Sequence, residues 1–220
     1  MHFQKPIVLL ALPITVSPLS CTTLLHHTSI AETSSYTITS ANPVFQTDKT
    51  YCNVSATIEN RIQTWFQLPT PEAWNGRYVQ IDCDVLDDGY GLGTTDMGVP
   101  TSTTDFNPMR GDLQMRLDWK YVSTRLTAVM GKQLPSVYYE REVVYSYHLG
   151  NSTGGRQSLV EAQRYLDDFN GVFVIAPAYN ETGVTTYSIS WTARAALLDE
   201  IAFTPAITNT EADLIHALVL

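Results

Sequence analysis

The stretch Val143–Gln157 constrains the fold of this chain more than any other, because it predicts a strand, a sharp turn and a helix in direct succession. Its first residues are β-branched and aromatic, the turn reads Gly150-Asn-Ser-Thr-Gly154, and a helical sequence follows. A G-x-S-x-G motif between a strand and a helix is a nucleophile elbow, in which a strained turn lifts a serine, here Ser152, out of a sheet. Both glycines are expected because a Cβ at either position would collide with the neighbouring backbone.

Helices and strands alternate around this stretch. One amphipathic helix is expected before it, with Pro135 ending the helix after Gly131. A short apolar strand, Gly171–Pro177, is expected after it. Strands that alternate with helices and have no polar face predict an α/β fold, with a mostly parallel sheet covered by helices on both faces. The helical spacing rests on Leu113, Leu117, Tyr121, Val122, Leu126, Val129 and Met130.

The two flanks of this region are less regular. Between Thr22 and Asp48 the sequence is rich in Ser, Thr and Ala, which indicates irregular surface chain. From Cys52 to Leu68 apolar and polar residues alternate on both sides of Glu59-Asn-Arg61, which predicts a β-hairpin. One helix is expected within Thr192–Phe203 and another from Asn209 onward.

The charge of the chain restricts its partners. Thirteen basic and 22 acidic side chains give a formal net charge of −9. This charge disfavours nucleic acid and anionic membrane surfaces, so small molecules or neutral polymers are the expected partners. At 220 residues the chain is long enough for one domain with one good core.

Residues 1–20 have the pattern of a signal peptide. A basic residue, Lys5, precedes an apolar run that ends at Val16 and is too short to cross a bilayer. Small residues follow as a cleavage region, so the chain is expected to be secreted, and a buried N-terminal strand is the alternative. Export fits the N-x-S/T glycosylation sequons at Asn53, Asn151 and Asn180.

The three cysteines cannot all pair within one chain. Cys21 and Cys52 are the expected disulfide. Cys83 is then either a buried thiol or half of a bridge whose partner is absent. No C-x-x-C pair and no close His/Cys cluster occurs in the sequence, so no metal and no cofactor is expected in this chain.

Several short motifs lie around and before the elbow. They are Tyr145-Ser-Tyr147, Gly150-x-Ser-Thr-Gly-Gly-Arg-Gln157, Glu161-Ala-Gln-Arg-Tyr165, Asp167-Asp-Phe-Asn-Gly-Val172 and Ala176-Pro-Ala178, with weaker landmarks at Tyr51-Cys-Asn-Val54, Trp74-Asn-Gly-Arg77 and Thr94-Thr-Asp-Met-Gly98. Together they resemble the tannase and feruloyl esterase family of α/β-hydrolases. The resemblance covers most of residues 52–191.

The resemblance implies hydrolysis of gallate or hydroxycinnamate (feruloyl) esters through a serine acyl-enzyme. By position, Ser152 is the nucleophile and the backbone N–H of Thr153 is one oxyanion donor. It also implies that residues 21–220 are the N-terminal part of a catalytic domain, a partial α/β-hydrolase fold without the lid domain and C-terminal strands. Calcium is implied only for the lid of full-length relatives.

Four departures from the family pattern accompany the resemblance. Asn151 stands where family members have a cysteine bonded to another cysteine next to the catalytic histidine. The glycine-rich loop that follows Trp74-Asn-Gly-Arg77 in the family is not visible. The family's catalytic aspartate and histidine come farther downstream than this chain extends. Asn151-Ser-Thr153 is itself a sequon, which folding is expected to bury before a glycan is attached. The chain is therefore expected to be truncated or impaired as an enzyme.

The sequence offers weak candidates for a catalytic base. His148 lies on the strand before the elbow and is expected to be a core or edge residue. Asp213 and His216 follow Ser152 in the hydrolase order, but a chance pair on one helix face is the simpler interpretation. Asp96 and Asp112 have no assigned role.

Two alternatives to the esterase hypothesis stay open. The first is a catalytically inactive descendant of the family that binds phenolic esters or a cell-wall polymer. The second is an unrelated α/β-hydrolase, a lipase or peptidase, with a base that the sequence does not reveal.

Overall fold

The computed structural model describes residues 20–27, 30–31, 34–46, 49–81, 89–99, 107–199, 204–205 and 207–219. The predictions about the signal peptide and about Cys83 lie outside these residues. The described residues include the elbow, the hairpin and both cysteines of the expected disulfide.

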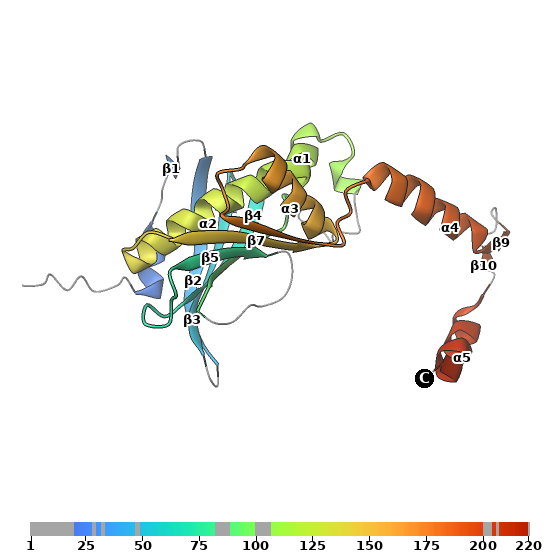
Figure 1. Ribbon diagram of the computed structural model, residues 1–220, viewed down its shortest axis with the longest axis horizontal. Helices are drawn as coiled ribbons and strands as arrows, with labels where there is room; N and C mark the ends of the chain where they lie inside the picture. The colour runs from blue at the N-terminus through green and yellow to red at the C-terminus, as the bar shows by residue number, and fades with distance from the viewer. Residues whose placement is uncertain are drawn as a thin grey trace, which may run out of the picture.

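An eight-stranded mixed sheet forms the body of the protein (Figure 1). Neighbouring strands are antiparallel from β1 to β6 and parallel from β6 through β5 and β7 to β8. The α/β class is therefore confirmed, with parallel pairing confined to the half of the sheet that carries the elbow. In spatial order the strands are β1 (Ile30–Ala31), β2 (Ser34–Phe45), β3 (Thr50–Ile58), β4 (Ile62–Pro69), β6 (Gly91–Thr95), β5 (Arg77–Ile81), β7 (Tyr145–Asn151) and β8 (Gly171–Ile175).

The predicted hairpin is confirmed as β3 and β4. Glu59, Asn60 and Arg61 connect the two strands. Glu59 and Asn60 have left-handed φ angles of 49° and 57°, in a turn that a hydrogen bond from the Arg61 N–H to the Ile58 carbonyl closes. The prediction of irregular chain between Thr22 and Asp48 is wrong, because Ser34–Phe45 within it is strand β2, paired with β3. Its Ser and Thr residues suit a strand with one face toward solvent.

The helix expected from Leu113 is longer and less regular than predicted. It comprises α1 (Leu113–Leu117), a π-helical segment η3 (Asp118–Val122) and α2 (Ser123–Tyr139). Pro135 does not end it, because the helix continues to Tyr139 and Glu140 terminates it with a left-handed φ of 53°. After 3-10 turn η2 (Asn107–Met109), these elements bring the chain back across the sheet.

The predicted apolar stripe is not the buried face of α2. Of the residues in the stripe only Met130 is fully buried, and Leu113 is 63% exposed. Half of the buried residues of α2 are Ser, Thr, Ala or Gly. The Tyr78 ring lies against the helix at Gly131, where a Cβ would be 2.1 Å from Tyr78 Oη. The π-helical segment also shifts the phase of the helix, which a constant 3.6-residue period cannot anticipate.

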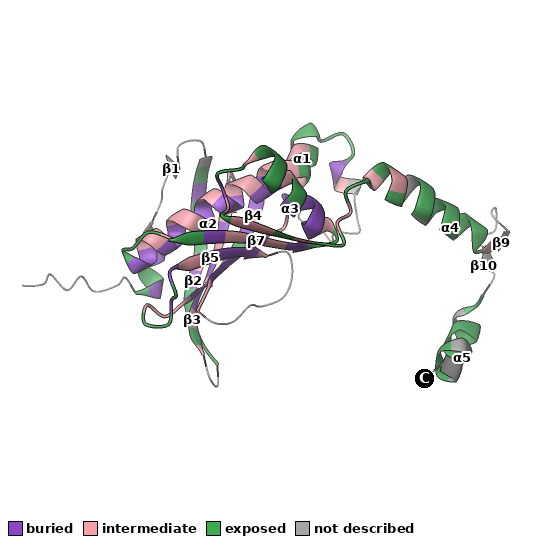
Figure 2. Cartoon of the chain, viewed as in Figure 1, coloured by how far each residue is buried: buried purple, intermediate pink, exposed green. Residues whose placement is uncertain are grey.

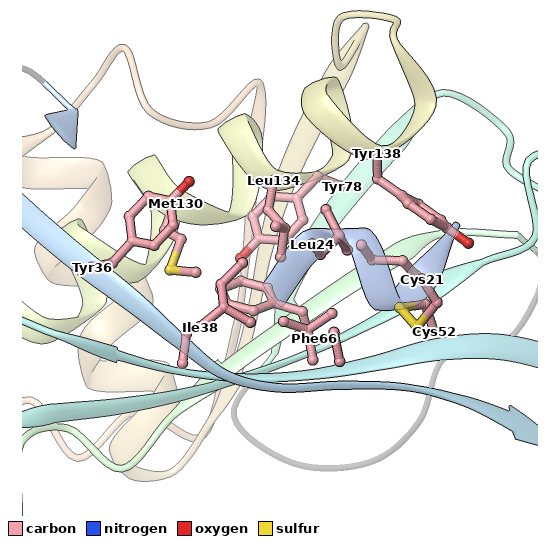
Figure 3. Packing of buried hydrophobic residues seen from close by; sticks show 14 of the residues in the cluster. Cys21, Leu24, Tyr36, Ile38, Cys52, Phe66, Tyr78, Met130, Leu134 and Tyr138 are labelled. Atoms are coloured by element: carbon pink, nitrogen blue, oxygen red, sulfur yellow. A yellow bond between two sulfur atoms is a disulfide. The ribbon is translucent and has the colours of Figure 1, made fainter. Parts of the chain in front are cut away.

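The main core lies between the sheet and α2 (Figure 3). Phe66 and Tyr78 from the sheet pack with Met130 and Leu134 from α2. The 3-10 helix η1 (Cys21–His26) joins this cluster through Leu24. The expected disulfide between Cys21 and Cys52 is present and connects η1 to β3.

Both long helices cover the same face of the sheet. Gln80 donates to the carbonyl of Thr124 on α2, and His148 bonds Ser158 on α3 (Thr153–Arg164). Gln80 and His148 are register partners on β5 and β7, so their side chains share one face. This differs from the expectation of helices on both faces: on the opposite face Phe173 is 59% exposed.

Residues after β8 leave the sheet (Figure 1). They form η4 (Thr182–Ile189), α4 (Ser190–Ala195), the pair β9 (Leu197–Asp199) and β10 (Thr204–Pro205), and α5 (Asn209–Val219). The helix expected within Thr192–Phe203 is therefore displaced toward the N-terminus, whereas the one from Asn209 is confirmed. Figure 2 shows that α4 is exposed along its length. None of the described helices has both the length and the apolar composition needed to cross a membrane.

Candidate active site

Ser152 lies at the carboxyl edge of the parallel half of the sheet, between β7 and α3. Its backbone has φ 54° and ψ −113°, a combination that is sparsely populated for residues other than glycine. The side chain is exposed. A strained, exposed serine between a strand and a helix is the geometry of a nucleophile elbow.

Backbone hydrogen bonds fix this turn on two sides. The Ser152 N–H donates to the carbonyl of Ile175 at 3.0 Å. The Ser152 carbonyl accepts from the N–H of Arg156 at 3.1 Å and from that of Ala178 at 3.0 Å. The strained residue is therefore held between the end of β8 and the first turn of α3.

Two glycines permit the close packing of the elbow. A Cβ on Gly150 would be 2.0 Å from the carbonyl oxygen of Gly154, so the first predicted glycine is required for the reason that the motif gives. The sequence did not indicate the second requirement, which falls on Gly155. A Cβ there would be 2.5 Å from the carbonyl oxygen of Ile175, because α3 begins directly against β8.

The residues beside Ser152 differ in their environments. Thr153 is the first residue of α3, so its N–H has no acceptor within the helix and carries the partial positive charge of a helix N-terminus. Asn151 is the last residue of β7 and is exposed. The expectation that folding buries this sequon is therefore wrong, because the strand ends at the sheet edge.

Arg156 attaches the first turn of α3 to the π-helical segment η3. Its guanidinium donates to the carbonyls of Trp119 and Lys120 at 3.1 and 3.0 Å and lies 3.9 Å from the centre of the Trp119 ring. A weaker ion pair joins it to Glu181 at 3.9 Å. The sequence showed Arg156 only as part of a motif, since the two carbonyls to which it donates lie 36 and 37 residues before it.

A buried polar layer lies beneath α3. His148 is 1% exposed, its Nδ1 is 2.7 Å from Ser158 Oγ, and burial lowers the pKa of its imidazole to about 4. Glu161 is also 1% exposed, and burial raises the pKa of its carboxyl group to about 8. The prediction that His148 belongs to the core is confirmed.

The remaining candidate acids and bases lie elsewhere. Asp213 and His216 are exposed on α5, which lies well away from β7 and α3 (Figure 1). Asp96 holds the loop after β6 by accepting from the N–H groups of Gly98 and Gln63, and burial raises its pKa. Asp112 caps α1 by accepting from the N–H of Met115 at 2.9 Å.

The remaining predictions concern the other glycosylation sequons, the glycine-rich loop and metal binding. Asn53 is half-buried on β3, and Asn180 is exposed just before η4. Residues 82–88, part of the segment where the family's glycine-rich loop would stand, lie outside the described residues. Within the described ranges, no group of three or more His, Cys, Asp or Glu side chains is arranged to hold a metal ion.

Comparison with known proteins identifies relatives of most of the chain. A family model for tannase and feruloyl esterase matches residues 51–220. An uncharacterized esterase from Xanthomonas campestris is 37% identical over an alignment of 127 residues that covers 51% of this chain and 22% of the relative. A probable feruloyl esterase from Arthroderma benhamiae is 32% identical over an alignment of 153 residues that covers 58% of this chain and 28% of the relative. The chain thus spans about a quarter of the length of these curated relatives.

A solved structure shares the arrangement of the sheet and helices. An esterase from Aspergillus oryzae matches with a TM-score of 0.70 and 20% identity, over 82% of this chain and 42% of that chain. This likeness shows the fold, which is of the α/β-hydrolase type. Since the family model covers the hairpin, the elbow and the helices after it, the chain belongs to the tannase and feruloyl esterase family.

Proposed function

We propose that this chain supplies the nucleophile of a secreted serine carboxylic ester hydrolase that acts on phenolic esters, either gallates or hydroxycinnamates such as ferulates. Its family consists of carboxylic ester hydrolases. The observation that carries the proposal is Ser152, exposed and strained at the sheet edge with φ 54° and ψ −113°. The phenolic substrate is supported by relatives such as the probable feruloyl esterase of Arthroderma benhamiae.

The proposed reaction uses the elbow in two steps. Ser152 Oγ attacks the ester carbonyl carbon and gives its proton to a base, and the tetrahedral oxyanion accepts a hydrogen bond from the Thr153 N–H. The alcohol leaves with the proton, and water then releases the acid from Oγ. The four histidines in the described ranges lie elsewhere, in η1, beside Tyr36, under α3 and on α5, so none of them is assigned as the base.

The signal-peptide pattern supports secretion, and N-linked glycans are proposed at Asn53 and Asn180. N-terminal sequencing of protein from the medium of a eukaryotic host is expected to begin near Cys21. The proposed reaction uses no cofactor from this chain, and its partner is the small phenolic ester itself.

A fluorophosphonate probe tests the nucleophile. We expect the folded chain to be labelled at Ser152, and expect labelling to disappear in Ser152→Ala and after heat denaturation. Ser190→Ala, which removes another exposed serine, is the matched control and is expected to label normally. Absence of labelling in the folded chain would leave an esterase fold without an activated serine.

Turnover of methyl gallate and methyl ferulate, compared with a short acyl ester, then tests the substrate class.

A non-catalytic phenolic-ester binding protein is the second candidate function. Asn151 next to the serine favours this candidate, as does the place of His216 on α5, an element that lies away from β7 and α3 in Figure 1. It predicts binding of a gallate or ferulate ester that Ser152→Ala leaves unchanged, with no turnover by either protein.

A further inference from the structure

The turn of the elbow is also a complete N-glycosylation sequon. Asn151 is followed by Ser152 and Thr153, and neither Ser152 nor Gly154 is a proline that would prevent its use. The acceptor asparagine and the candidate nucleophile are therefore adjacent residues.

Asn151 is exposed in the folded protein. Gly150 faces α3, since a Cβ there would be 2.6 Å from Ser158 Oγ. Successive side chains of a strand point to opposite faces, so Asn151 lies on the face that α2 and α3 leave uncovered. Its exposure is consistent with this direction. A glycan on Asn151 is thus compatible with the native fold.

The surface beside Asn151 is apolar. Asn151 is the register partner of Ile175, which is 46% exposed, and Phe173 on the same face is 59% exposed. Contiguous exposed apolar side chains favour association between molecules. A hydrophilic glycan extending over Ile175 and Phe173 would shield them, so the position suits a glycan as well as permitting one.

We propose that Asn151 is an N-glycan acceptor and that molecules glycosylated there cannot react at Ser152. The co-reactant is a polyprenyl-pyrophosphate-linked oligosaccharide of the secretory pathway. Asn151 Nδ2 forms a bond to the anomeric carbon and loses one proton, while the bond from that carbon to the pyrophosphate oxygen breaks and the lipid pyrophosphate leaves. This inference rests on the secretion and the nucleophile of the proposed function.

The loss of reactivity at Ser152 follows from how close the glycan on Asn151 would lie to it; this loss is called silencing below. The Cα atoms of adjacent residues are about 3.8 Å apart, so the first sugar lies at the same carboxyl edge from which an ester must approach Ser152. The sequon at Asn53 lies on β3, in the antiparallel half of the sheet, so a glycan on it leaves this edge open.

Mass spectrometry of protein from a eukaryotic secretory host tests the acceptor site. Trypsin separates the sequons, because Thr50–Arg61, Glu142–Arg156 and Tyr165–Arg194 each contain one. Removal of N-glycans enzymatically in heavy-oxygen water converts occupied asparagines to labelled aspartates. We expect this conversion at Asn151 in the full chain and in Ser152→Ala, in which the sequon is intact. An unmodified Glu142–Arg156 peptide, in protein from the medium or from secretory membranes, overturns the proposal.

Fluorophosphonate labelling of the same samples tests the silencing. We expect the probe and the glycan on different copies of the Glu142–Arg156 peptide, and expect Asn151→Gln to restore labelling to the level of protein made in a bacterial cytoplasm. Probe and glycan together on one peptide would overturn the silencing. If Asn151→Gln also fails to react, the nucleophile of the proposed function and the silencing both fall, while occupancy still decides the acceptor site.

Discussion

Glu161 is a buried carboxyl group whose pKa is raised by its environment. It lies on the buried side of α3, and neither of its carboxylate oxygens has a hydrogen-bond partner within the described structure. Asp168 opposes its ionisation and the nearby Arg125 and Lys132 favour it, but burial is the largest effect. With a pKa of about 8, this carboxyl group is protonated in the folded protein at neutral pH.

Glu161 therefore makes stability depend on pH. Its pKa rises from an ordinary 4.5 to about 8 on folding, so the stabilisation is complete below pH 4.5 and is lost as the pH rises through 8. Over this range the wild type is expected to lose on the order of a few kcal/mol in the free energy of unfolding, and Glu161→Gln is expected not to show this loss. Urea unfolding measured from pH 5 to 9 checks this as a difference from wild type. The exposed Glu142→Gln is the matched control, and parallel curves for wild type and Glu161→Gln would contradict the assignment.

At this scale the sequence predicts residues whose constraint is local. Ser152 and Gly150 are recognisable because the strain and the collision arise within one turn. Gly155 and Glu161 are not, because what decides their roles is β8 and the helix packing beneath α3, which are distant in sequence. The exposure of Asn151 is not predictable for the same reason, because the position of a residue at a sheet edge is a property of the assembled sheet.

The elements around the elbow are joined by one side chain. Arg156 on α3 donates to two successive carbonyls of η3, those of Trp119 and Lys120. Stacking on Trp119 holds the guanidinium plane in place. The position of Ser152 relative to the neighbouring elements thus depends on Arg156.

Arg156→Lys tests this connection. Lysine keeps the charge but cannot bond both carbonyls in one plane, so we expect a loss of about 1–3 kcal/mol in the free energy of unfolding. We also expect slower fluorophosphonate labelling of Ser152 under conditions where the variant is fully folded. Arg164→Lys, which changes an arginine over the Tyr121 ring on the same helix, is the control and should leave both quantities nearly unchanged. Equal labelling rates for Arg156→Lys and wild type would show that Arg156 does not position Ser152.

Elements with a strong local pattern are predicted, and those defined by their partners are not. The β3–β4 hairpin alternates buried and half-buried residues along both strands, so its period is visible in the sequence. Strand β2 has Ser or Thr at five of its twelve positions, and its pairing with β3 identifies it as a strand. On α2 Gly131 faces the Tyr78 ring, and small residues share the buried face with Met130 and Leu134, so an apolar stripe alone does not locate that face.

At the scale of the whole molecule, the sequence indicates the α/β class but not the mixed sheet. The order of helix, strand, elbow, helix and strand predicts the parallel half from β5 to β8, since such connections return the chain in the same direction. The antiparallel half follows from the hairpin and from β2, which extends the sheet beyond the hairpin. The first segment of the described chain, η1, is held against this half by the Cys21–Cys52 disulfide and by the packing of Leu24.

The disulfide therefore contributes to the stability of the whole domain. It closes a loop with a sequence separation of 31 residues, for which the restriction of the unfolded chain predicts a stabilisation of about 2–4 kcal/mol. We expect Cys21→Ala/Cys52→Ala to lose this amount in urea unfolding, and expect wild type in the presence of reductant to match the double variant. Each single alanine variant should lose a similar amount, because either one opens the loop. An equal urea midpoint with and without reductant would contradict this prediction. It would show that the disulfide does not add the stabilisation expected for a loop of this length, and that packing alone holds η1.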